Sequence, residues 1–218
     1  TTATIKTVTV NPLPVVTLTG PISVCKNSTG NTYTTEAGMS NYQWVVSAGG
    51  TVTSGGTAGN NTAIITWNTV GVQSVSVNYT NANGCTAAAP TPVAVTVNAL
   101  PVPALAGPAS ACVTSTGNIY TTDAGMTGYI WTVSSGGTIT AGGTATDNTV
   151  TVTWNTSGSQ SVSVNYTNAN TCTATTATML PVTVNPLPVP TITGNAAACL
   201  NITGNIYSTE AGMTAYIW

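Results

Sequence analysis

Residues 149–154 read TVTVTW, and residues 161–166 read SVSVNY. In both stretches an apolar side chain alternates with a small polar one. Successive side chains of a β-strand point to opposite faces of the sheet, so an alternation of period two is typical of strands with one buried and one exposed face. The two stretches therefore predict two β-strands that each line a core.

The alternation recurs through residues 12–98, where it predicts seven short strands. They are expected near residues 15–24 (interrupted at Gly20-Pro21), 31–35, 42–47, 51–54, 62–67, 74–80 and 92–97. Gly-Gly and Asn-Gly pairs, which tolerate the positive φ of tight turns, separate several of them. Seven short strands in a segment of this length are typical of an immunoglobulin-like β-sandwich, so we expect an all-β fold.

The chain repeats itself with a period of 87 residues. Residues 25–85 and 112–172 align without a gap and are identical at 42 of 61 positions, so they are copies of one module. The cysteines and tryptophans repeat as well: Cys25, Cys112 and Cys199 are equivalent, as are Cys85 and Cys172, Trp44 and Trp131, and Trp67 and Trp154. We therefore expect tandem sandwich modules.

The repeat register divides the chain into four parts. Residues 12–98 and 99–185 are two complete modules, and residues 186–218 match only the first part of a third, truncated module. Residues 1–11 match the last strand of a module, so we expect them to be the closing strand of a preceding one. Half a module would leave strand edges unpaired, which indicates a segment of a longer array.

The composition excludes several classes of protein. The chain has two basic and four acidic residues and no histidine, so only 3% of its residues are charged. Two lysines cannot form the basic patch that nucleic-acid binding requires. Without histidine and with few carboxylates, acid–base catalysis is not expected, and we predict neither an enzyme nor a cofactor. No apolar run approaches the length of a membrane helix, so no membrane span is predicted in this stretch.

The tryptophans have two interpretations. Trp44, Trp67, Trp131 and Trp154 could form a platform on which sugars stack, or they could lie in the module cores. Each occurs on the apolar side of its alternating stretch, where burial of a large aromatic side chain stabilises the fold by a few kcal/mol. We therefore predict that all four are core aromatics.

No metal site is expected. Glu36, Asp123 and Glu210 occupy one repeat position, in the loop after the second strand of each module. A single carboxylate per module is too few for a calcium ion, which takes six to eight oxygen ligands. The cysteines form no Cys-x-x-Cys pair and have no histidine beside them, so zinc is not predicted either.

The repeated motifs resemble a known group of proteins. Residues 42–46 read YQWVV and residues 129–133 read YIWTV; each is followed by Gly-Gly-Thr, then by Ile-Thr-Trp or Val-Thr-Trp, and the first module closes with Val-Thr-Val-Asn at 95–98. This pattern is similar to the PKD-like, immunoglobulin-like repeats of large cell-surface proteins and adhesins in gliding and other type IX-secreting bacteria. The resemblance covers the whole chain and implies export, tandem stacking, and adhesion or extension at the cell surface.

Five cysteines in a chain of this type indicate disulfides, and two pairings are open. Cys25 could pair with Cys85 and Cys112 with Cys172, inside each module. In a sandwich of this order, however, Cys25 and Cys85 lie at opposite ends, roughly 20 Å apart, whereas a disulfide needs Cα atoms within about 7 Å. In a head-to-tail stack Cys25 could instead meet Cys172 of the next module. Cys85, Cys112 and Cys199 would then pair with flanking modules.

These observations predict a structural role. Fewer than five residues separate the last strand of one module from the first strand of the next, and Pro101 stiffens this linker. We expect a stiff spacer or filament segment in a long extracellular fibre, stalk or adhesin, with neighbouring modules and other copies in a filament as partners. The alternative is an adhesive module that binds a glycan or another surface through its loops.

Overall fold

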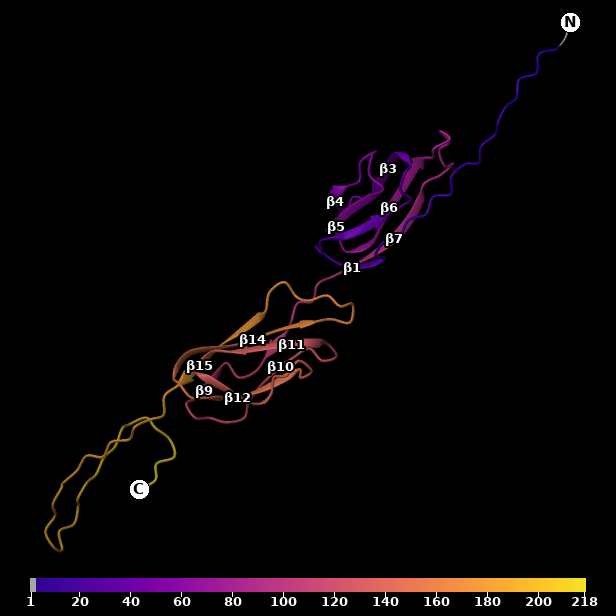
Figure 1. Ribbon diagram of the computed structural model, residues 1–218. Coiled ribbons are helices and arrows are strands. Elements are labelled where there is room, and N and C mark those ends of the chain that lie inside the picture. The colour runs from indigo at the N-terminus through magenta and orange to yellow at the C-terminus, as the bar shows by residue number, and fades with distance from the viewer. Residues whose placement is uncertain (1–2) are drawn as a thin grey trace.

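The computed structural model describes residues 3–218 and shows two β-sandwich modules arranged along one axis (Figure 1). Every regular element in this part of the chain is a β-strand, so the predicted all-β, tandem-sandwich fold is confirmed. No helix in residues 3–218 could cross a membrane. An extended segment precedes module 1, and an open loop of chain follows module 2.

Module 1 contains seven strands in two sheets. They are β1 (Ser23–Cys25), β2 (Asn31–Thr34), β3 (Ser40–Val46), β4 (Gly50–Gly55), β5 (Thr62–Trp67), β6 (Gly71–Thr80) and β7 (Thr91–Asn98). One sheet has the order β1-β7-β6-β3 and the other β2-β5-β4. Only β1 and β7 pair in parallel, and the remaining neighbours are antiparallel.

Module 2 repeats this arrangement with one additional short strand. Its strands are β8 (Leu105–Ala106), β9 (Ser110–Cys112), β10 (Asn118–Thr122), β11 (Thr127–Val133), β12 (Gly137–Gly142), β13 (Thr149–Trp154), β14 (Gly158–Thr167) and β15 (Thr178–Asn185). The sheets have the orders β11-β14-β15-β9 and β12-β13-β10-β8, and β9 runs parallel to β15. The two modules therefore have the same topology.

The strand predicted near residues 15–24 is much shorter in the structure, where only Ser23–Cys25 forms β1. Thr19 forms an isolated bridge with Thr34 of one sheet, whereas Ser23 pairs with Thr96 of the other. The chain changes sheets at Gly20-Pro21, because proline has no N–H to continue a ladder. Gly20 also allows a close approach: a Cβ there would lie 2.3 Å from Cδ1 of Tyr33.

The core of each module contains one fully buried tryptophan. Trp67 is fully buried on β5, its Nε1 donates a hydrogen bond of 3.1 Å to Oη of Tyr33, and the two rings meet edge to face. Trp154 and Tyr120 repeat this pair in module 2 at 3.2 Å. Valines at alternate positions of the facing strands complete the cores, as the period-two pattern predicts.

The two ends of the chain form little regular structure. Residues 3–11 are exposed and belong to no strand in the described part of the chain, and residues 1–2 of the predicted closing strand lie outside it. In residues 186–218 the backbone pairing within the described chain is a single bridge between Thr193 and Ser208. The assignments of residues 1–11 to a preceding module and of 186–218 to a third module stay predictions.

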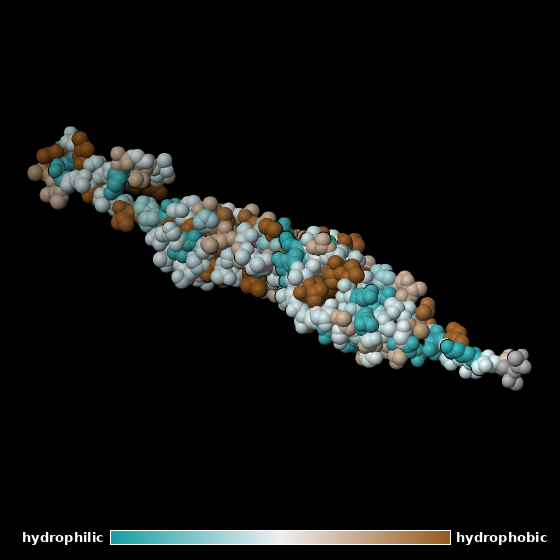
Figure 2. All heavy atoms as spheres, turned by 90° about the horizontal axis from the view of Figure 1, so that it is seen from above, coloured by the Kyte–Doolittle hydropathy of each residue, from teal (hydrophilic) through white to brown (hydrophobic). Residues whose placement is uncertain are grey.

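The surface of the chain is weakly polar, as expected for a sequence with few charged residues. Figure 2 shows one elongated surface in which weakly polar residues predominate and apolar residues form small groups. The alternating strands explain this surface, because their outward positions are mostly threonine and serine.

Candidate functional site: the disulfide joint between the modules

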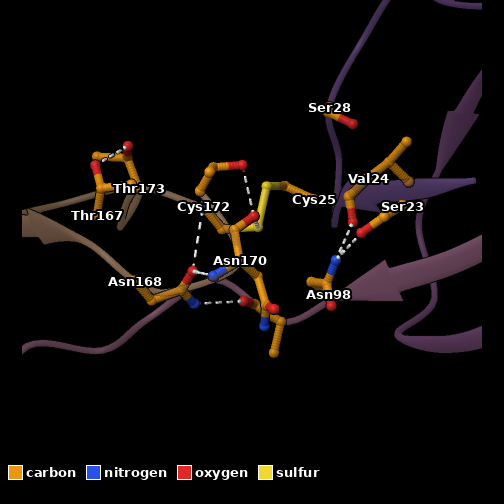
Figure 3. Close-up of a disulfide and its surroundings, with 12 residues drawn as sticks. Ser23, Val24, Cys25, Ser28, Asn98, Thr167, Asn168, Asn170, Cys172 and Thr173 are labelled. Carbon is orange, nitrogen blue, oxygen red and sulfur yellow. Dashed lines mark hydrogen bonds between the residues drawn. A yellow bond between two sulfur atoms is a disulfide. The ribbon is translucent and has the colours of Figure 1, made fainter. Parts of the chain in front are cut away.

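The two modules meet where the ends of β1 and β7 face the turn between β14 and β15. Figure 3 shows a disulfide at this joint, with strands of module 1 on one side and the turn of module 2 on the other. Cys25 belongs to module 1 and Cys172 to module 2. We refer to this region, together with its linker at residues 99–104, as the joint.

Cys25 is held in place by its neighbours on β7. In the parallel register it lies opposite Asn98, and the backbone N–H of Lys26 donates a 2.8 Å hydrogen bond to the carbonyl oxygen of Asn98. The side-chain amide of Asn98 donates to Oγ of Ser23 at 2.9 Å and to the carbonyl oxygen of Val24 at 3.2 Å. The last residue of β7 therefore fixes the end of β1, where Cys25 points out of module 1.

Cys172 is presented by a turn that Asn168 organises. The Oδ1 atom of Asn168 accepts hydrogen bonds from the backbone N–H of Asn170 at 3.0 Å and of Cys172 at 3.1 Å. The backbone N–H of Asn168 donates to the carbonyl oxygen of Cys172 at 2.9 Å, which closes the turn. Cys172 has no exposed surface, so the bond is shielded from solvent on the module 2 side.

The disulfide joins Cys25 to Cys172, with 5.5 Å between their Cα atoms and a sequence separation of 147 positions. The pairing between modules is confirmed, and the pairing of Cys25 with Cys85 is wrong. Cys85 precedes the first residue of β7, whereas Cys25 lies beside the last. The eight residues of β7 separate them by about 26 Å, which is too far for a disulfide.

The same turn and the first residue of β15 also hold the linker. The side-chain Nδ2 of Asn168 donates a 3.3 Å hydrogen bond to the carbonyl oxygen of Ala99, and Oγ1 of Thr178 donates to that of Pro103 at 2.6 Å. Pro101 and Pro103 restrict the backbone of the linker itself. The joint is thus restrained by a covalent bond, by hydrogen bonds and by proline.

Three cysteines form no disulfide in the described residues: Cys85, Cys112 and Cys199. Cys85 occupies the same kind of turn as Cys172, since its N–H donates to Oδ1 of Asn81 at 3.0 Å. Cys112 lies opposite Asn185 in the register, as Cys25 lies opposite Asn98. The outer ends of the two modules therefore carry the two halves of the joint.

One carboxylate in each module holds the segment that leads into it. Glu36 accepts a hydrogen bond from the backbone N–H of Thr17 at 3.0 Å, and Asp123 and Glu210 accept equivalent bonds from Ala104 and Thr191 at 2.9 Å each. The repeat position identified in the sequence therefore has a structural use.

The surroundings of Glu36 and Tyr79 shift their pKa values in opposite directions. Partial burial alone would raise the pKa of Glu36, but hydrogen bonds from Thr17, Thr35 and Tyr79 and from its own backbone N–H outweigh it and lower that pKa to about 2. Burial and the nearby carboxylate raise the pKa of Tyr79 to about 12. Glu36 is therefore ionised at neutral pH and keeps its hydrogen bonds.

The predicted core aromatics lie inside the modules to different degrees. Trp67 and Trp154 are fully buried, Trp131 is 9% exposed, and Trp44 is partly buried against the core. Nε1 of Trp44 donates to the carbonyl oxygen of Asn60 at 2.9 Å, which satisfies its polar edge.

In the part of the chain that the structure describes, no three side chains of histidine, cysteine, aspartate or glutamate gather in a way that could hold an ion.

The sequence did not reveal the roles of Asn98 and Asn168. Asparagine is so common in turns that neither position stood out. The usable signal was the repeat itself, because the same asparagine occurs four residues before both Cys85 and Cys172.

Comparison with known proteins gives one family and several distant structures. Residues 11–95 and 98–182 each match the family described as PKD-like domain. Among solved structures, the D00-D0 domain of intimin is 17% identical, with 78% of this chain and 99% of that chain covered and a TM-score of 0.40. No curated protein matches the chain.

Two further solved structures resemble the chain at similarly low sequence identity and TM-score. The Clostridium thermocellum CbhA fibronectin(III)-like modules are 14% identical, with 79% of this chain and 95% of that chain covered and a TM-score of 0.36. InvD of Yersinia pseudotuberculosis is 19% identical, with 88% of this chain and 66% of that chain covered and a TM-score of 0.30.

Proposed function

The chain belongs to the PKD-like domain family, and from this premise we propose that its modules form a stiff structural segment of a long extracellular fibre, stalk or adhesin. The observation that carries the proposal is the disulfide between Cys25 and Cys172. A bond inside a module would serve that module alone, whereas this one fixes the position of one module on the next. In this role the modules set reach and stiffness and catalyse no reaction.

The partners of each module are its neighbours in the array. Cys85 and Cys112 lie in the same local settings as Cys172 and Cys25, so we assign each of them a disulfide to a flanking module. Cys199 is equivalent to Cys112 by the repeat and takes the same role one module further on. Every joint of the array is then closed by one disulfide.

The proposed location is the cell surface. Disulfides form and persist in oxidising compartments outside the cytosol, which supports an extracellular site for a chain held by them. Only 3% of the residues of the chain are charged, so the interactions of its surface depend little on salt, as suits a fibre in variable surroundings. Export by the type IX route is the part of this proposal that rests on resemblance alone.

Electron microscopy and small-angle scattering test this role. The oxidised full chain is expected to give rods in which both modules lie on one axis, with a narrow distribution of the angle between them. Cys25→Ser should widen that distribution, since only the linker and its hydrogen bonds remain. Cys85→Ser, which removes an equivalent cysteine outside the joint, is the matched control and should leave the angle unchanged.

A bent or freely hinged oxidised chain would contradict the proposal. So would the same angular spread in the oxidised chain and in Cys25→Ser.

A further inference from the structure

The joint lies on the path that tension would follow along the chain. A pull on the two ends enters module 1 through the segment that leads to β1, and it leaves module 2 through β15. Cys25 is the last residue of β1, and Cys172 lies six residues before the first residue of β15. The disulfide therefore connects the strand that receives the tension to the strand that releases it.

We propose that the Cys25–Cys172 bond carries tension directly from module 1 to module 2, so that residues 26–171 lie outside the load path. This inference rests on the proposed mechanical role and adds how that role is performed. Most core residues of both modules belong to the bypassed segment, including the pairs Tyr33–Trp67 and Tyr120–Trp154.

Without the bond, tension must pass through the folded modules. In module 1 it would act across the parallel pairing of β1 with β7, where three residue pairs from Ser23↔Thr96 to Cys25↔Asn98 hold the strands together. Each such hydrogen bond contributes only about 1 kcal/mol net. Once β1 separates from β7, module 1 can unravel from Lys26 onward.

With the bond, the covalent route crosses the joint in one step. The Cα atoms of Cys25 and Cys172 are 5.5 Å apart and stay so while the bond is intact. The chain between Cys25 and Cys172, a sequence separation of 147 positions, would span about 500 Å if fully extended. That length is unavailable to the pulled chain, and the modules keep their folds because no force reaches them end to end.

Within the two modules, the segments that remain on the load path are residues 12–25 and 173–185, which run along the modules and have their own anchors. Thr17 is held by Glu36, and β15 pairs along its length with β14 from Thr178 to Val184. Extension of these segments releases little additional length, because they run along the modules rather than folding back. Without the bond, each module could unfold under tension. With the bond, the two modules together are nearly inextensible.

Single-molecule force spectroscopy on the full chain tests this inference. Enzymatic tags at the two termini provide the handles, and Cys85, Cys112 and Cys199 are replaced by serine in every sample to prevent other disulfides. The oxidised chain is expected to show no unfolding step of the two modules and a final length about 500 Å shorter than that of Cys25→Ser. The difference in final length holds whether or not the Cys25→Ser variant folds, and Cys172→Ser should reproduce it.

A reductant added during the pull gives a second readout. One thiolate of dithiothreitol attacks a sulfur of the bond, the S–S bond breaks to a mixed disulfide, and the second thiol closes the cyclic oxidised reductant and frees both cysteines as thiols. Because tension does work as the S–S bond lengthens, cleavage should speed up with force. Unfolding of the modules should then release the missing length of about 500 Å.

Two results would overturn the inference: module-unfolding steps in the oxidised chain, or a cleavage rate that does not change with force. Either could occur in a chain that is still rod-shaped, which would leave the proposed spacer role standing. A chain that hinges at the joint but shows no unfolding step and a force-dependent cleavage rate would instead contradict the spacer role and support this inference. The two proposals can therefore fail separately.

Discussion

Asn168 donates a hydrogen bond of 3.3 Å from its side-chain amide to the carbonyl oxygen of Ala99, while its Oδ1 atom accepts the backbone N–H of Cys172. One side chain thus holds both the linker and the turn that carries the disulfide. Asn81 makes the equivalent contacts to Pro12 and Cys85 in module 1, where no disulfide forms among the described residues. This pair of asparagines allows a controlled test.

Asn168→Ala should loosen the turn around Cys172. The variant loses the acceptor for two backbone N–H groups, so we expect module 2 to lose about 1–3 kcal/mol of unfolding free energy. We also expect the Cys25–Cys172 bond to be reduced faster by dithiothreitol, measured by timed alkylation and mass spectrometry. Asn81→Ala is the control and should leave the reduction rate unchanged; equal rates in the two variants would contradict the role given to Asn168.

Gly20→Ala should destabilise module 1. An alanine Cβ at this position would lie 2.3 Å from Cδ1 of Tyr33, so the ring must move and its hydrogen bond with Trp67 is strained. Overpacking of this kind costs about 1–3 kcal/mol. Urea unfolding followed by tryptophan fluorescence measures the loss.

Gly59→Ala is the matched control for Gly20→Ala. Nothing lies within 4 Å of a Cβ at Gly59, so the change should stay within about 0.5 kcal/mol. Similar losses in both variants would show that the space beside Tyr33 is not the cause.

Acid should weaken module 1 through Glu36. The pKa of Glu36 is lowered from 4.5 to about 2 in the folded protein, because hydrogen bonds to the ionised form outweigh the effect of partial burial. Its contribution is therefore complete above about pH 4.5 and is lost as the pH falls toward 2. Glu36→Gln should flatten the dependence of the unfolding free energy on pH across this window.

Asp123→Asn provides the comparison in module 2, where hydrogen bonds from Tyr166 and Ala104 lower the pKa of the carboxyl group. It should leave the acid dependence of module 1 intact. An unchanged acid dependence in Glu36→Gln would argue against the hydrogen bond to Thr17 as its source.

Peptide mapping without reduction should recover one linked pair from the isolated chain. Two lysines give trypsin few sites, so cleavage after tyrosine and tryptophan is the practical choice. We expect a peptide that joins Cys25 to Cys172 and alkylation of Cys85, Cys112 and Cys199 in freshly purified protein. A peptide that joins Cys25 to Cys85 would contradict the strand order of module 1.

Local alternation predicted most of the fold because each module is built from strands with one buried face. The pattern TVTVTW became β13 with Trp154 fully buried, and SVSVNY became the inner part of β14. It predicted an interruption at Gly20-Pro21 but not the change of sheet there, because that change depends on which distant strand lies alongside. Alternation indicates which face of a strand is buried, but it does not indicate which strand pairs with it.

The joint was predictable to a similar extent. Strand length disfavours Cys25–Cys85, so the predicted topology favoured Cys172 and left the pairing inside the module open. The hydrogen bonds of Asn98 and Asn168 were not predictable in the same way, because they join residues that are distant in sequence or lie in turns of ordinary composition.

The position of Cys172 also sets an order of events during the synthesis of the chain. Domains generally fold as they emerge, from the N-terminus onward. Module 1 is therefore expected to reach its native fold while the thiol of Cys25 is still unpaired, since its partner lies 147 positions further along the chain. Cys85 appears first, yet the folded length of β7 keeps it out of reach. The disulfide at the joint thus forms only after both modules have folded. In a growing array, the newest module would fold before the disulfide to its predecessor forms.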